Sequence, residues 1–170
     1  MKNLPGTAIE NVFSDPKKTL YSIFASGGLF LSQVCFVTGI ELHTVQNWVK
    51  RGFVAPPIEK RYSVRQVCRI AIINMLRDVL PLDTALQLLR YINGALDDES
   101  DDMIDDSVLY LKFCDMIINN KDSKEMVMDI EDLTARTRTE KVLDAMFYAY
   151  KSAEYKRLAK EIIDNKGEEK

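Results

Sequence analysis

Apolar residues recur at helical spacing between residues 31 and 54, and they outline two short helices with a break between them. The break falls at Gly39, which can adopt the positive φ of a sharp corner, and Gly52 suits the end of the second helix. Two short helices joined by a glycine-containing turn form a helix-turn-helix. We therefore predict helices over residues 31–38 and 41–51. Their apolar positions are Leu31, Val34, Cys35 and Thr38 in the first helix, and Leu42, Val45 and Val49 in the second.

The second helix has a polar face opposite its apolar one. Residues spaced i, i+3, i+4 and i+7 carry hydrogen-bonding groups there, namely His43, Gln46, Asn47 and Lys50. A helix with such a face can enter the major groove of DNA and read base edges. An ordinary helical hairpin with a solvated polar face has the same pattern. The periodicity alone leaves both interpretations open.

The segment that follows, residues 53–62, interrupts the helical pattern. Pro56 and Pro57 stand next to each other and exclude a helix, and the segment is too short for an independent sheet. We predict a small turn-like wing that carries Lys60 and Arg61.

Further helices are predicted on both sides of this segment. A short lead-in helix is expected around residues 20–24. Ser63 and Gln66 form a capping-box pattern that opens a helix to about Val79. The next helix is expected over residues 81–93.

The C-terminal part of the chain begins with the acidic run 97–102, which we interpret as a solvated linker. A helix is predicted over 103–119, followed by a loop and a shorter helix. The longest helix is predicted to open with a capping box at Thr137 and Glu140 and to end near Asn165. The inward residues of the shorter helix are expected to be Met126, Val127, Ile130 and Leu133.

The longest helix carries a broad apolar stripe that we predict to be the interface of a homodimer. The stripe consists of Val142, Met146, Phe147, Tyr150 and Ala153. Aromatic residues are candidates for lining a pocket for a small-molecule or protein effector, with core packing as the alternative. These residues are Phe113, Phe147, Tyr148, Tyr150 and Tyr155.

Composition fits a soluble globular protein of 170 residues, with 46% hydrophobic and 29% charged residues. Residues 1–96 contain 11 Lys/Arg and 6 Asp/Glu, a net charge of +5, whereas residues 97–170 contain 12 and 20, a net charge of −8. A basic part that bears the helix-turn-helix and an acidic part without one fit a binding module and a second unit. We therefore predict an all-α protein with a DNA-binding domain over 1–96 and a helical unit over 97–170.

Other classes of function find little support in the sequence. The chain has 3 cysteines, no CxxC pair and one histidine, so neither a zinc site nor a disulfide framework is indicated. No catalytic triad, P-loop or dinucleotide fingerprint occurs, and we predict neither an enzyme nor a bound cofactor. The uncharged run 20–40 contains several polar residues and glycines, which argues against a membrane anchor. We expect reduced, inert cysteines and a cytoplasmic protein.

Five short segments of the sequence are informative through their order. The pieces LSQV, TGI, TVQNWVKRGFV, RYS and LPLDTALQLL follow one another between residues 31 and 92. Their order resembles the N-terminal domain of MerR-type winged-helix transcriptional regulators, and the layout also resembles a MerR-like bacterial domain family of unassigned function. The resemblance implies a winged helix-turn-helix that binds double-stranded DNA, regulates transcription and forms homodimers.

The resemblance also implies which residues approach DNA. Thr44, Gln46, Trp48 and Lys50 fall at the contact positions of the second helix, and Arg61 falls in the wing. With the polar face and its basic neighbours, the complete predicted set is His43, Thr44, Gln46, Asn47, Trp48, Lys50, Arg51, Lys60 and Arg61. Trp48 has an alternative role as a half-buried core aromatic. For the whole chain, the alternative is a protein-interaction module that keeps the winged-helix fold without binding DNA.

Overall fold

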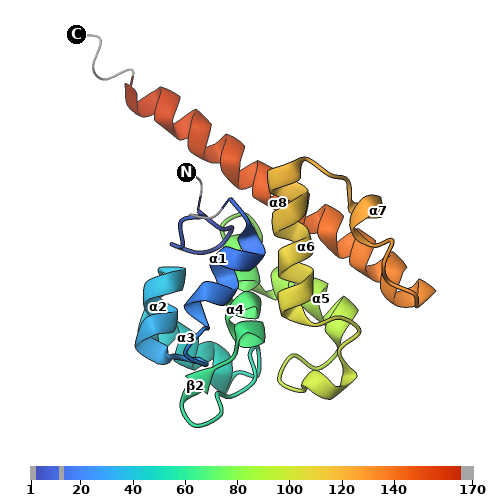
Figure 1. Ribbon diagram of the computed structural model, residues 1–170. Helices are drawn as coiled ribbons and strands as arrows, with labels where there is room; N and C mark the ends of the chain where they lie inside the picture. Colours follow the sequence, from blue (N-terminus) through green and yellow to red (C-terminus); the bar gives the residue numbers. More distant parts are fainter. Residues whose placement is uncertain (1–2, 12–13, 166–170) are drawn as a thin grey trace.

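The computed structural model describes residues 3–11 and 14–165, and this part of the chain is mainly helical (Figure 1). The coarse prediction of a helical protein is therefore confirmed. In chain order the elements are α1 (Pro16–Ile23), β1 (Leu29–Phe30), α2 (Leu31–Thr38), α3 (Leu42–Lys50), β2 (Arg61–Tyr62), α4 (Val64–Leu76), α5 (Leu82–Asn93), the 3₁₀ helix η1 (Glu99–Asp101), α6 (Asp106–Asn119), α7 (Ser123–Met126) and α8 (Leu133–Asn165).

The helix α4 lies at the centre of the molecule and packs against α2, α5, α6 and α8 (Figure 1). It begins at the predicted capping box: the Ser63 hydroxyl accepts a hydrogen bond from the Gln66 N–H at 3.2 Å, and the Gln66 side chain accepts one from the Ser63 N–H at 2.8 Å. From Gln66 to Ile73 every residue of α4 is buried. A helix that is buried on all sides lies inside the core rather than on its surface.

Two arginines of α4 are paired with acidic residues that follow α5. The guanidinium of Arg69, only 3% exposed, lies 2.8 Å from the Asp106 carboxylate and donates a hydrogen bond to the Leu96 carbonyl at 2.6 Å. Arg65 pairs with Asp102, whose side chain is also buried. The interpretation of the acidic run as a solvated linker is therefore wrong for its last residue. The predicted boundary at residue 96 lies where the chain turns back onto α4.

A short antiparallel sheet joins β1 and β2, with Leu29 opposite Tyr62 and Phe30 opposite Arg61. The sequence predicted the region of β2 as a wing but gave no sign of β1, because a pair of residues cannot display the alternation that identifies a strand. The link between these distant segments holds the wing against the start of α2.

The start of α8 differs from the prediction. Asp132, not Thr137, caps the helix, and its carboxylate accepts a hydrogen bond from the Ala135 N–H at 2.6 Å. Thr139 lies inside the helix and is fully buried. The predicted shorter helix is reduced to the single turn α7, and Leu133, which we expected to face inward, is exposed.

The apolar stripe predicted as a dimer interface is used inside the chain. Val142 and Met146 are fully buried in the hydrophobic core, and Tyr150 packs its ring edge-on against the buried Phe113 at 5.9 Å. Val142 and Met146 cannot contact a second copy, and Phe147, Tyr150 and Ala153 are half-buried, so the stripe as predicted cannot serve as a dimer interface.

Two of the three cysteines lie in the core between α4 and α6. Cys68 and Cys114 are buried, and burial raises the pKa of the Cys114 thiol to about 12. Among the described residues no cluster of potential ligands could hold a metal ion, and none of the helices there has the length and apolar character needed to span a membrane.

The ion cluster gives a testable dependence of stability on pH. Burial raises the pKa of Asp106 to about 6, although the neighbouring Arg69 lowers it in part. In the unfolded chain the pKa of this carboxyl is about 3.9. Its contribution to the free energy of unfolding is therefore fully present below about pH 3.9 and is lost as the pH rises to about 6. From pH 4 to 7 the free energy of unfolding of the wild type should fall relative to Asp106→Asn, by on the order of 2 kcal/mol. Chemical denaturation at a series of pH values measures this difference, and parallel curves for the two proteins would contradict it.

Candidate nucleic-acid interface

The turn between α2 and α3 is fixed by hydrogen bonds within α2 and from α4. Gly39 adopts a left-handed conformation with φ 69°, and its N–H donates to the Cys35 carbonyl at 2.9 Å. On α4, the Asn74 amide donates to the carbonyls of Thr38 and Gly6, at 3.1 Å and 3.0 Å. The end of α2 is thereby fastened to the central helix, and the direction of α3 is fixed with it.

The helix α3 turns its polar face outward. Val45 and Trp48 are buried against the core, while His43, Gln46, Asn47 and Lys50 are exposed. Thr44 is half-buried at the edge of this face. The predicted polar face is therefore present on the surface as a continuous strip one helix long.

Trp48 does not belong to that strip. Its side chain is only 2% exposed, and the guanidinium of Arg77 lies over its ring at 5.2 Å. This burial does not fit the prediction of Trp48 as a DNA-contact residue, and it fits the alternative role as a core aromatic, more deeply buried than expected. The position lies three residues after the fully buried Val45, on the inward side of α3.

Several apolar side chains near the polar strip are exposed, which the sequence reasoning did not foresee. Leu42 was expected in the core but is half-exposed, and Phe36 on α2 is 84% exposed. Phe36 falls outside the predicted stripe of α2, so the periodicity already contained this signal. In the wing, Ile58 is 79% exposed.

The wing ends in a tight hairpin between Ile58 and Arg61. The Arg61 N–H donates to the Ile58 carbonyl at 2.8 Å, and the reverse bond measures 3.1 Å. Glu59 and Lys60 form the turn with φ values of 49° and 64°, a conformation that favours glycine or asparagine. On the other side, the Gln66 amide donates to the Ala55 and Pro56 carbonyls at 2.9 Å and 3.0 Å. The hairpin is thus rigidly presented, with Lys60 at its tip.

The basic side chains of this region differ in whether they already have partners within the chain. Arg61 donates to the Gly28 carbonyl at 2.8 Å and lies over the Phe30 ring at 4.1 Å, and Arg51 lies over the Phe53 ring at 4.5 Å. Lys50 and Lys60 are exposed and form no salt bridge with any residue that the structure describes. Together with Glu41 and Glu59, these groups give the surface between residues 41 and 61 a net charge of +2.

The polar face of α3, the exposed Phe36 of α2 and the hairpin between Ile58 and Arg61 lie at the same end of the molecule, where Figure 1 shows α2, α3 and β2 next to one another. The elements α2 and α3 pack together, and β2 packs against α2 and α4. This end combines hydrogen-bonding side chains, free positive charge and exposed apolar groups. It is the candidate site for a macromolecular partner.

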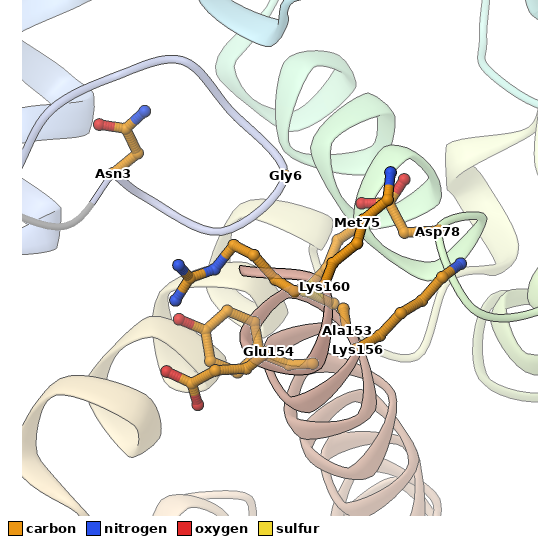
Figure 2. Close-up of a pocket in the computed structure, with 10 residues that line it drawn as sticks. Asn3, Gly6, Met75, Asp78, Ala153, Glu154, Lys156 and Lys160 are labelled. Atoms are coloured by element: carbon orange, nitrogen blue, oxygen red, sulfur yellow. The ribbon is translucent and has the colours of Figure 1, made fainter. Parts of the chain in front are cut away.

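A second candidate site lies at the other end, where α8 leaves the body. A groove of about 810 Å³ separates α8 from the N-terminal loop and the end of α4, and Figure 2 shows Asn3 and Gly6 on one side of it and Ala153 and Lys160 on the other. The groove is open and its charged groups have both signs. Of the aromatic residues predicted to line an effector pocket, only Tyr150 lines this groove. Phe113 is in the core, and Tyr148 and Tyr155 are exposed on α8, so the predicted aromatic pocket is not formed.

Comparison with known proteins identifies relatives of the central part of the chain. A curated protein from Bacillus subtilis (strain 168), described as "Uncharacterized protein YkrK", is 24% identical over 107 residues. That alignment covers 61% of this chain and 46% of the relative, so the chain spans about half of the relative's length. No solved structure matches.

The family that matches is described as "Domain of unknown function (DUF1836)", and its model covers residues 28–113, half of the chain. It is not the MerR type, so the assignment suggested by the sequence pieces is wrong. Those pieces encode a helical hairpin, a turn and a capped helix, which are shared by many helix-turn-helix folds and do not define one family. The matched region extends from β1 into α6 and contains the whole candidate interface. The chain belongs to the DUF1836 family.

Proposed function

We propose that this protein binds double-stranded DNA in a sequence-specific manner and regulates transcription. In this proposal α2 and α3 act as a helix-turn-helix, and the hairpin between Ile58 and Arg61 acts as its wing. The observation that carries the proposal is the outward face of α3. It offers His43, Gln46, Asn47 and Lys50 to a partner on a helix whose direction is fixed by its buried side and by the anchored turn.

The residues of this face have the chemistry that base recognition requires. The amide groups of Gln46 and Asn47 can each donate and accept, which matches the N6 and N7 atoms of adenine in the major groove. Lys50 stands one turn further along the same face as Gln46, where a free ammonium group suits a phosphate oxygen. The polar strip thus combines groups that discriminate bases with a group that adds affinity for any duplex.

The wing adds a second basic contact. Lys60 is free and stands at the tip of a rigid turn, while Arg61 already has a carbonyl and an aromatic ring as partners. Of the two, Lys60 is the better candidate for a phosphate contact. From the sequence we predicted DNA contacts for both residues equally, because the sequence contains no sign of the contact between Arg61 and β1.

A selection experiment tests the proposed function. The full chain is incubated with random duplex DNA, bound molecules are recovered, and the enriched sequences are read. Specific binding should produce a recurrent motif, and affinity should fall steeply with rising salt as counterions are released from the duplex. Failure to enrich any motif, with an affinity that salt does not change, would refute DNA recognition.

Substitutions in α3 should separate base reading from phosphate contact. Gln46→Ala should cost roughly 1–3 kcal/mol on the selected motif and little on unrelated DNA, since it removes a base contact. Lys50→Ala should weaken all duplexes alike and reduce the salt slope by about one. Both side chains are exposed, so the melting temperature should change little in either variant. Equal loss on all sequences for Gln46→Ala would contradict its role in base reading.

Lys60→Gly should affect stability and binding in opposite directions. Glycine relieves the left-handed conformation at this position, so the free energy of unfolding should rise by roughly 0.5–1 kcal/mol. DNA affinity should fall, because the charge at the tip is lost. Lys60→Ala is the matched control: it removes the same charge but keeps a Cβ atom, so it should weaken binding equally without stabilising the protein. Binding unchanged in both variants would exclude a DNA contact by the wing.

The exposed apolar groups favour a second candidate function, the recognition of another protein. Phe36 and Ile58 are among the most exposed large apolar side chains that the structure describes, and both lie at the end that carries α3. If the surface binds a protein, Phe36→Ser should abolish the interaction and Lys50→Ala should have little effect. If instead Lys50→Ala weakens binding to DNA and Phe36→Ser has little effect on it, the first proposal is supported.

A further inference from the structure

The outer half of α8 extends beyond the rest of the molecule. Figure 1 shows this end of the helix projecting past the other elements. The last buried residue of α8 is Ala149, and none of the residues from Lys151 to Asn165 is buried. This segment is about 22 Å long at the rise of an α-helix. An isolated helix of this length is only marginally stable in water.

One side of α8 faces the body from the inner half as far as the groove at Lys160. In the inner half this side consists of buried residues spaced three and four apart, such as Thr139, Val142 and Met146. The same spacing continues through Tyr150 and Ala153 to Arg157 and Lys160 at the groove, where Figure 2 shows Ala153 and Lys160. The body-facing side therefore changes from apolar to charged where the helix leaves the core.

The opposite side changes in the reverse direction. Positions seven residues apart share a face of a helix, and on the outward face this series reads Thr134 and Lys141, then Tyr148, Tyr155 and Ile162. Leu158 and Ile163 widen the second part of the series. These five apolar side chains are 41–70% exposed. Apart from Leu133 at the start of α8, the outward face is thus polar where the helix packs on the body and apolar from Tyr148 onward.

This reversal has a physical consequence for the free chain. A helix on the surface of a monomer normally buries its apolar side against its own body and turns its charges to water. In the outer half of α8 the apolar side points away from the body, so no part of the described chain covers it. The stripe of Tyr148, Tyr155, Leu158, Ile162 and Ile163, hereafter the outer stripe, is therefore available to a partner from outside.

We propose that the outer stripe pairs with the outer stripe of a second copy of this chain in a two-helix coiled coil. An identical helix offers the same seven-residue spacing, which is the repeat of coiled coils, and a two-fold interface is self-complementary by construction. With about 100 Å² for each of the five side chains, each copy would bury about 500 Å², or about 1,000 Å² in total, the lower limit of a specific interface. A dimer with a dissociation constant in the micromolar range is expected.

The charges around the outer stripe fit a protein partner better than a membrane surface. Helices that lie on anionic membranes have a polar face rich in Lys and Arg. The segment from Lys151 to Asn165 contains four basic residues, but also Glu154, Glu161 and Asp164, for a net charge of +1. Two of these acids are paired within the helix, Glu154 with Lys151 at 3.0 Å and Glu161 with Arg157 at 2.5 Å. The polar face is therefore nearly balanced.

A dimer would deepen the proposed function by supplying two copies of α3 for two half-sites of an operator. Only this consequence rests on DNA binding, because the pairing itself is argued from α8 alone. The experiment therefore measures mass in the absence of DNA.

Sedimentation of the full chain across the micromolar range tests the pairing. The wild type should shift from monomer to dimer as concentration rises. The variant Tyr155→Glu/Ile162→Glu should remain monomeric, because it places two charges in the stripe of each copy. Lys160→Glu is the matched control: it changes the net charge by the same −2 but lies on the side of the groove. It should dimerise as the wild type does, and circular dichroism at concentrations where all three proteins are monomeric should show equal helix content and melting.

Two results would overturn the proposal. One is a wild type that stays monomeric throughout, and the other is a Tyr155→Glu/Ile162→Glu variant that still dimerises. Flotation with phosphatidylcholine–phosphatidylserine vesicles tests a membrane as the alternative partner. If the wild type is monomeric and binds the vesicles, and the Tyr155→Glu/Ile162→Glu variant does not bind them, the outer stripe is a membrane-binding surface instead of a dimer interface. A dimer that selects no DNA motif would uphold the pairing and refute the proposed function, so the two failures are distinguishable.

Discussion

The buried guanidinium of Arg69 is the constraint on which the arrangement of the helices depends. A buried charge without partners is strongly destabilising, so the chain after α5 must return to α4 and bring Asp106, Asp102 and the Leu96 carbonyl to it. That return sets α6 beside α4, and α8 then closes the core that both helices share. The family match extends from residue 28 to residue 113 and so includes both arginines of the cluster and both acids. The basic and acidic parts of the sequence are thus joined within one family domain.

Sequence patterns predicted the elements whose signals are local. The capping box at Ser63 and Gln66 and the polar face of α3 were predicted correctly, since a helix start and a period of 3.6 involve neighbouring residues only. The errors arose where two residues could cap the same helix and where contacts join residues far apart in the sequence. Asp132 outcompeted Thr137 as the cap of α8, and the ion pairs of Asp102 join residues more than thirty positions apart. Trp48 could not be assigned, because it lies at the border of the polar and apolar faces and only packing decides its side.

Several departures from ordinary folding rules lie at the candidate interface, while others, such as the positive φ of Asn120 and the exposed outer stripe of α8, lie elsewhere. Glu59 and Lys60 occupy a turn that favours glycine or asparagine, and Phe36 and Ile58 expose apolar surface at a cost in free energy. The large side chains of α4 from Gln66 to Ile73 are buried, whereas α6 exposes Val108 and Ile118. Local rules are broken most often where a surface is needed for binding, because stability does not select such residues. At the candidate interface these features stand next to a polar helix face, and this combination supports a functional role for that end without depending on the identity of the partner.

The long helix α8 serves two purposes in the fold. Its inner half is a core helix that packs on α4, α5 and α6, and its outer half presents apolar residues to solvent. Because one continuous helix serves both purposes, the position of any partner on the outer half is fixed relative to α4, and through Asn74 relative to the turn before α3. A partner bound there would lie away from α2, α3 and the hairpin and leave them accessible (Figure 1). The fold therefore separates the surface suited to self-association from the surface suited to recognition, while a rigid core links the two.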